Sequence, residues 1–290
     1  MSTFGAEIYA RKMEIVRTPE GQATIFRDSV VITDSSTRLF SQSCRLLQSR
    51  SLAVMNDSVQ IESPDARVWA DSAVYRLNEK RAELFGRVRV LQDSLAISAP
   101  SLVYSTLERQ VRADRGLTLE NLGKTWRLTG QRGMFNLDSG VGVVDSMPVL
   151  SRLERETVEV TSRVMSWFEK ETKAAAFGAI RMTSGASELC CDTAIFFAQS
   201  DSGVAWGNPQ VRDSAGAASG DTMLFLVRNG ALEQVAIRKN ARGRYRTASH
   251  EEVLVQGETI RLALAHGNID RIEVEKLTLG QLVRRPEESR

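Results

Sequence analysis

The sequence predicts an all-β fold, an elongated antiparallel structure built from repeats of about 30 residues with two strands each. Apolar and polar residues alternate through much of the chain, which is the period of a half-buried strand. Short polar clusters such as residues 78–81 separate the alternating segments, as turns do. The alternation also recurs at a nearly fixed interval, which is typical of stacked supersecondary units.

The segment from Asp57 to Val90 shows the unit most clearly. Val59 and Ile61 alternate with polar neighbours, residues 66–70 do the same, and the alternation resumes from Ala82. Two strands and a return strand are therefore predicted, each with one apolar face. A single copy cannot bury that face alone, so we expect each copy to pack on the next.

Two markers fix the repeat length. Val30, Val59, Val88 and Leu117 lie 29 residues apart, and the first two follow the same Asp-Ser pair. The second marker is a small residue followed five positions later by a large one. It occurs at Ser41/Leu46, Ala70/Tyr75, Ala99/Tyr104, Gly130/Phe135, Ser162/Trp167, Cys191/Phe196 and Gly220/Phe225.

Length and charge fit one repetitive domain. A continuous repeat within 290 residues predicts a single elongated repetitive β domain over residues 1–278 and a polar tail over 279–290. The net charge of +2 gives no electrostatic bias toward nucleic acid, so no nucleic-acid partner is expected. No apolar run reaches the 18 residues or so of a spanning helix.

Three local features have expectations of their own. Residues 154–173 could be mistaken for a helix, but alternating valines with interleaved threonines favour strands. Pro100 lacks an N–H and indicates an edge or a bulge. Residues 199–219, rich in Gly, Ala and Ser, are expected to form a long connection.

The sequence offers little to support catalysis. His250 and His266 stand at no metal-ligand spacing, and no phosphate loop or nucleophile elbow is present. Asp71, Asp192 and Asp221 recur with the repeat, so we interpret them as turn residues that bind local backbone rather than as a carboxylate ladder. No enzyme activity, cofactor or metal is therefore expected, and the three cysteines are assigned no role.

One basic segment is ambiguous. Residues 238–246, RKNARGRYR, hold five basic side chains around Gly243. The simpler interpretation is a solvated hairpin, and the functional alternative is a patch for an anionic group such as a phosphate. The candidate headgroup residues are Arg238, Lys239, Arg242, Arg244 and Arg246.

Residues 70–113 also carry a family resemblance. The pattern small-Asp-x-x-x-aromatic, followed by a strand ending Leu-x-Gly-x-Val as in residues 84–88, resembles the OstA-like domain of lipopolysaccharide-transport proteins. That domain occurs in LptA, in LptC and at the N-terminus of LptD. The resemblance covers roughly residues 24–275 and implies a twisted, V-shaped jellyroll with an open apolar trough. The repeat spacing drifts after Gly116, so the register of the second half is less well defined.

What the resemblance implies is a periplasmic protein of lipopolysaccharide transport. Its trough would hold acyl chains of lipopolysaccharide or a similar glycolipid, each buried CH₂ contributing about 0.8 kcal/mol. Unpaired end strands would join other OstA-like jellyrolls, or a second copy of the chain, by strand addition. The candidate trough residues are Val59, Ile61, Val68, Tyr75, Leu84, Val88, Val90, Tyr104, Leu117, Leu119 and Phe135.

Two other classes of function stay open. A structural β-solenoid scaffold with a dry interior predicts large interior residues in every copy, and the small residues at Ala70, Ala99, Gly130 and Gly220 count against it. An enzyme on a repetitive β scaffold predicts an acidic and aromatic cluster in the middle copies. No export leader is visible in the sequence, so a cytoplasmic location is the alternative to the periplasm.

Overall fold

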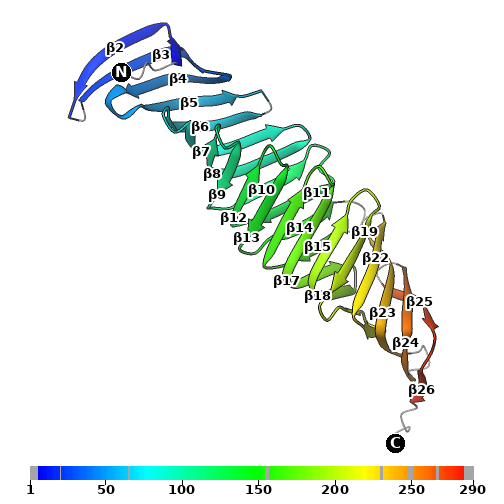
Figure 1. The fold of residues 1–290 in the computed structure, drawn as a ribbon. Helices are drawn as coiled ribbons and strands as arrows, with labels where there is room; N and C mark the ends of the chain where they lie inside the picture. Colours follow the sequence, from blue (N-terminus) through cyan, green and yellow to red (C-terminus); the bar gives the residue numbers. More distant parts are fainter. Residues whose placement is uncertain are drawn as a thin grey trace, which may run out of the picture. The chain divides into compact units, whose positions relative to one another are not determined.

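The computed structural model describes residues 6–19, 21–64, 66–153, 157–228, 231–246, 251–265 and 268–283. The described residues form 26 β-strands and a single turn of 3₁₀-helix, η1 (Gln48–Arg50), and the strand pairs are antiparallel (Figure 1). The predicted all-β antiparallel fold is thus confirmed. Within this part of the chain, no helix has the length and apolar character that crossing a bilayer requires.

The chain divides into two compact units. Unit 1 comprises residues 1–124 and 129–144, and unit 2 comprises residues 125–128 and 145–290. The strands from unit 1 to its boundary are β1 (Ala6–Tyr9), β2 (Lys12–Thr18), β3 (Gly21–Asp34), β4 (Thr37–Leu47), β5 (Leu52–Glu62), β6 (Arg67–Arg76), β7 (Arg81–Gln92), β8 (Leu95–Ser105), β9 (Gln110–Ala113), β10 (Leu117–Asn121), β11 (Trp126–Gly130), β12 (Arg132–Asn136) and β13 (Val141–Asp145).

Unit 2 continues with the same kind of strand. Its members are β14 (Val149–Leu153), β15 (Thr157–Thr161), β16 (Val164–Phe168), β17 (Lys173–Ser184), β18 (Ser187–Phe197), β19 (Ser202–Trp206), β20 (Gln210–Arg212), β21 (Gly216–Ser219), β22 (Thr222–Arg228), β23 (Ala231–Arg246), β24 (Glu252–Ala265), β25 (Asn268–Glu275) and β26 (Leu279–Val283). The whole repetitive domain over residues 1–278 stays a prediction.

The 29-residue period has a structural cause, a pair of left-handed residues in the middle of a strand. Asp28–Ser29, Asp57–Ser58 and Gly86–Arg87 all have positive φ, and the strand register shifts at each pair. Two residues then oppose one on the neighbouring strand, which makes a β-bulge that bends the strand. We call each such pair a corner. Further corners are Gly178–Ala179 in β17 and Lys239–Asn240 in β23. Ser146–Met147 and Gly207–Asn208 form the same kind of corner between two successive strands.

The corners explain the recurring aspartates and correct their sequence-based interpretation. The backbone N–H of Asp192 donates to the carbonyl of Gly207 (2.9 Å), and that of Asp221 donates to the carbonyl of Lys239 (3.1 Å). The side chain of the second corner residue then donates to the carboxylate: Asn240 Nδ2 lies 2.9 Å from Asp221 Oδ2. These residues therefore stabilise a corner of the adjacent strand rather than a local turn.

Asp71 completes this pattern in unit 1. The Arg87 guanidinium donates to its carboxylate over 2.7 Å and holds the pKa of that carboxyl below its usual range. Pro100 lies opposite the same corner, where the register of β7 and β8 shifts, so the predicted bulge is confirmed. A bulge is a place where a residue without an N–H costs least.

Of the other local predictions, some are confirmed and some are wrong. Residues 157–161 and 164–168 form β15 and β16, so the strand interpretation of this segment is confirmed. The long connection expected over residues 199–219 is wrong, because β19, β20 and β21 occupy it. Residues 279–283, expected in the polar tail, form β26 and pair with β24. Residues 284–290, His250 and His266 lie outside the described residues.

Candidate functional site

The interior of unit 1 contains every trough residue that the sequence proposes. Those eleven side chains are between 0 and 9 % exposed, with Tyr75 and Tyr104 completely buried. Each comes from the inward-facing side of a strand, because side chains alternate faces. A void of about 10 Å³ lies among Leu117, Leu119 and Phe135, which is about the minimum that one water needs.

Polar contacts show that unit 1 folds back over this interior. Tyr75 Oη donates to Asp34 Oδ2 at 3.3 Å, although β3 and β6 are three strands apart in the ladder. In a flat sheet that separation would be about 14 Å. The ends of the two strands must therefore meet across the interior.

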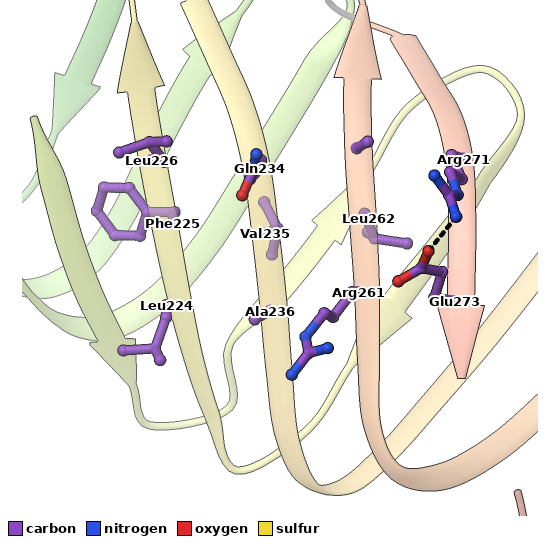
Figure 2. A pocket seen from close by; sticks show the side chains of 11 residues that line it. Leu224, Phe225, Leu226, Gln234, Val235, Ala236, Arg261, Leu262, Arg271 and Glu273 are labelled. Atoms are coloured by element: carbon purple, nitrogen blue, oxygen red, sulfur yellow. Dashed lines mark ion pairs between the residues drawn. The ribbon is translucent and has the colours of Figure 1, made fainter. Parts of the chain in front are cut away.

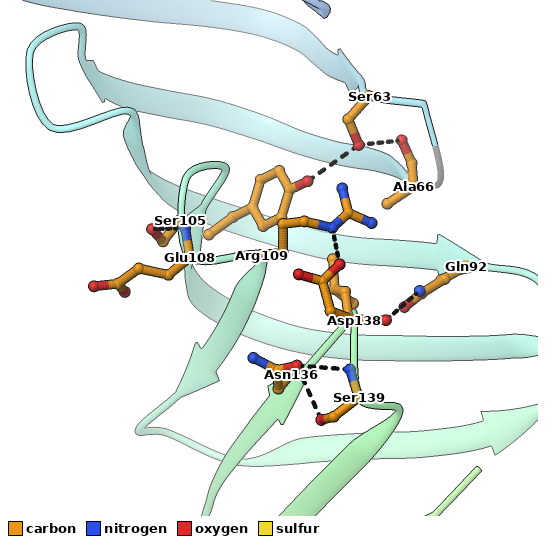
Figure 3. A network of polar contacts seen from close by, with 11 residues as sticks. Ser63, Ala66, Gln92, Ser105, Glu108, Arg109, Asn136, Asp138 and Ser139 are labelled. Carbon is orange, nitrogen blue, oxygen red and sulfur yellow. Dashed lines mark hydrogen bonds and ion pairs between the residues drawn. The ribbon is translucent and has the colours of Figure 1, made fainter. Parts of the chain in front are cut away.

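Similar links recur along unit 1. The Ser63 and Tyr104 hydroxyls lie 3.1 Å apart, and Gln92 Nε2 donates to the carbonyl of Leu137 at 2.9 Å (Figure 3). Lys80 also forms an ion pair with Asp34, whose side chain is only 4 % exposed. The interior of unit 1 is closed on this side by polar contacts between strands that are not neighbours.

Unit 2 contains larger apolar cavities than the void among Leu117, Leu119 and Phe135. One apolar cavity of about 60 Å³ and another of about 130 Å³ are both lined by Leu150, Arg152, Ala174 and Phe196. Small side chains leave the room, because an alanine run borders the first cavity on β17. The remaining residues of the smaller cavity are Val158, Val160, Met165, Ala175, Ala176, Met182, Ala194, Phe225 and Val227.

The larger cavity also has polar and aromatic walls. Arg152 and Asp201 both line it and form an ion pair at 2.5 Å. Trp126 and Trp167 line it too, with ring centroids 4.6 Å apart and planes tilted by 40°. Such a cavity can accommodate an apolar chain. The Arg152–Asp201 ion pair in its wall could contact a charged group attached to that chain.

These residues of unit 2 were not predicted as site residues, although Trp167, Phe196 and Phe225 carry a repeat marker. The available signal was the pair Ala176 and Ala194, which stands where the same register of unit 1 has Leu84 and Leu102. Drift in the repeat spacing after Gly116 obscured which residues of this half face inward.

The outer face of unit 2 bears a shallow groove of about 470 Å³ (Figure 2). Ala236 and Ala263 are among its lining residues, and the Arg271–Glu273 ion pair lies along one side. Both charges of that pair are satisfied within the groove, and Arg261 is paired with Glu275. The groove therefore presents no unbalanced charge to a ligand.

The basic segment is part of one long strand. Arg238, Lys239, Arg242, Arg244 and Arg246 are all exposed, as expected, but β23 runs through them with a corner at Lys239–Asn240. The hairpin interpretation is therefore wrong. Arg244 pairs with Glu252 on β24. The five residues lie on the outward side of β23, so a role in binding headgroups stays a prediction.

Burial controls the chemistry of the cysteines. It raises the pKa of both Cys44 and Cys191 to about 12. The pKa of Cys190 is raised as well, first by burial and then by its hydrogen bond to Glu188. All three thiols are free.

The fold and its interior together define an antiparallel β-jellyroll closed over an apolar core in each unit. Residues 7–110 match the family described as LptA/(LptD N-terminal domain) LPS transport protein, which confirms the resemblance found in the sequence. Solved structures also match, among them LptH, "the LptA homologous periplasmic component of the conserved lipopolysaccharide transport device from Pseudomonas aeruginosa". That match has 20% identity, covers 35% of this chain and 76% of LptH, and has a TM-score of 0.32. No curated protein matches the chain.

Proposed function

We propose that this protein takes part in lipopolysaccharide transport in the periplasm by holding acyl chains of lipopolysaccharide or a similar glycolipid in its apolar interior. The family match over residues 7–110 supports the process. The observation that carries the binding role is the apolar cavity space in unit 2, bordered by Ala176 and Ala194, where the same register of unit 1 has Leu84 and Leu102. A chain of several methylenes gains about 0.8 kcal/mol for each CH₂ it buries there.

Partner jellyrolls would join at the end strands. In the described residues β2 pairs with β3 alone and β26 pairs with β24 alone, so each has one free edge. Met13 and Ile15 on β2, and Leu282 on β26, are at least half exposed. An exposed edge strand with apolar side chains is suited to strand addition by another copy or another OstA-like domain.

A titration of the full chain with fluorescently labelled lipopolysaccharide tests the binding role. Ala194→Leu fills the 60 Å³ cavity and should weaken binding several-fold, because a larger side chain occupies the space of the acyl chain. Circular dichroism and thermal melting check that the variant is folded. Undetectable binding by the folded wild-type protein would contradict the proposal.

The dry scaffold is the second candidate, and the tight packing around Tyr75, Tyr104 and Leu119 in unit 1 favours it. It predicts that Ala194→Leu leaves lipopolysaccharide binding at zero in both proteins and that the filled cavity changes stability alone.

A further inference from the structure

The ion pair of Arg152 and Asp201 differs from the other contacts between non-neighbouring strands. It joins β14 to the turn before β19, residues 49 positions apart. In unit 1 the corresponding Asp34–Lys80 pair includes a carboxylate that is 4 % exposed. Arg152 and Asp201 keep 22 and 37 % of their side-chain surfaces exposed, so solvent reaches both members of the pair.

The same pair borders empty space. Arg152 lines both cavities of unit 2, and Asp201 lines the larger one. Asp34 and Lys80 line neither. The charged pair therefore has solvent on one side and an apolar cavity with room for several waters on the other.

This arrangement suits a particular ligand chemistry. A guanidinium group binds phosphate and carboxylate oxygens through paired N–H donors, and Asp201 presents such oxygens in the closed structure. A lipid phosphate could replace the carboxylate of Asp201 without leaving the arginine unpaired. The aromatic pair Trp126–Trp167 and the shared residues Leu150, Ala174 and Phe196 then provide apolar surface for the attached chain.

We infer that Arg152 and Asp201 form an entry port for an anionic acyl lipid, in which the lipid phosphate takes the place of Asp201 on Arg152 while the acyl chain enters the cavities beneath. This inference rests on the proposed function and assigns it a location, a headgroup ligand and an opening contact. Breaking the pair separates the strand ends of β14 and β19 and exposes the cavity.

The test uses calorimetric titration of the full chain with decyl phosphate and, as the uncharged comparison, decyl glucoside, both below their micelle concentrations. Arg152→Gln should weaken decyl phosphate binding about tenfold, the effect of losing a charge-assisted hydrogen bond, and leave decyl glucoside within about twofold. Arg152→Lys should retain most of the phosphate binding. Asp201→Asn should tighten decyl phosphate binding about threefold or more, because the competing carboxylate charge is gone.

The buried pair of unit 1 provides the matched control. Asp34→Asn and Lys80→Gln should leave both affinities within about twofold, since that pair lines neither of the two cavities of unit 2. A decyl phosphate tail brominated near its end should quench tryptophan fluorescence in the wild-type protein and much less in the Trp126→Phe/Trp167→Phe variant.

Three results would overturn the port. They are equal decyl phosphate affinity in wild type and Arg152→Gln, an equal loss of both probes, and an unchanged affinity in Asp201→Asn. If Arg152→Gln does not fold, the decyl phosphate affinities of Asp201→Asn and Arg152→Lys test the port by themselves. Lipopolysaccharide binding that is equal in wild type and Arg152→Gln would remove the port and leave the proposed function standing, whereas no lipopolysaccharide binding by wild type removes both.

Discussion

At the scale of single residues, the recurring sequence motif reflects the backbone conformation that each corner requires. Gly86 has φ of +70°, and a Cβ at this position would lie 2.3 Å from Asp71 Oδ2. A left-handed conformation costs an ordinary residue roughly 1–2 kcal/mol. The Leu-x-Gly-x-Val pattern therefore records a corner where the strand must bend and where the facing aspartate comes close.

Replacing Gly86 by alanine should destabilise unit 1 by about 2–4 kcal/mol, from the left-handed conformation together with the contact to Asp71. Gly116→Ala is the matched control, because Gly116 has φ of +77° and nothing within 4 Å of the added Cβ. Urea unfolding should show the smaller loss for Gly116→Ala, and Asp71→Gly should remove most of the difference. Equal losses of unfolding free energy in the two alanine variants would show that the contact with Asp71 does not contribute to the effect.

A second residue-level feature is the small side chain at the repeat marker, as at Ala70, Ala99, Gly130 and Gly220. A Cβ at Gly220 would lie 2.5 Å from Ile237 Cγ2 and 2.9 Å from the carbonyl oxygen of Lys239. Small size at this marker position is therefore required by the neighbouring corner. The small residues at this position therefore do not count against a dry scaffold. Ligand binding has to distinguish the scaffold from a lipid-binding protein.

The buried thiols provide a prediction about pH. At pH 8, Cys44 and Cys191 should react with a thiol reagent far more slowly than Cys190, because burial raises their pKa to about 12 and restricts access. Since the folded-state pKa exceeds that of the unfolded chain, stability from this source is complete below about pH 8.5 and is lost as pH rises toward 12. Labelling followed by mass spectrometry measures the order, and fast native labelling of Cys191 would contradict it.

At the scale of elements, strands and their inward faces were predictable, whereas their bends were not, apart from the bulge that Pro100 indicated. Period-2 alternation identified Val59, Leu84 and Val88 as inward-facing because burial selects apolar side chains on one face of a strand. The corners escaped notice because Asp-Ser, Gly-Arg and Lys-Asn have little in common beyond tolerating positive φ. The cavities in unit 2 escaped it as well, because a void depends on which strands face each other across the interior.

A carboxylate introduced at an inward-facing position of β7 should reduce stability much more than one introduced at an outward-facing position. Val88→Asp places a carboxylate at a site that is 1 % exposed and should cost several kcal/mol of stability. The exposed neighbour Arg89 provides the control, and Arg89→Asp should change stability by less than about 1 kcal/mol. Chemical denaturation of the two variants measures the difference, and similar midpoints would contradict the assignment of faces. Weaker lipid capture by a folded Val88→Asp protein would further support a lipid-facing interior.

At the scale of the whole molecule, the proposed joining of partner jellyrolls requires a free strand edge. Strand addition needs backbone N–H donors on the exposed edge. Glu14→Pro removes one N–H donor from β2, and Ile15→Pro removes the next one along the strand. If β2 forms the joint, one of the two prolines should abolish self-association or partner binding, because alternate N–H groups of an edge strand point outward. Analytical ultracentrifugation tests this, and unaltered association in both variants would locate the joint elsewhere.

Site-specific photo-crosslinking along β17 and β7 tests the central claim, that acyl chains lie in the interior, most directly. A photoreactive amino acid is placed in turn at inward-facing Ala174, Ala176, Met182 and Leu84, and at outward-facing Arg181 and Glu83, in chains exposed to lipopolysaccharide. The account predicts lipid adducts at the inward positions, strongest at those bordering the cavities of unit 2, and few at the outward ones. Adducts of equal yield on both faces, or none at Ala174 and Ala176, would contradict it.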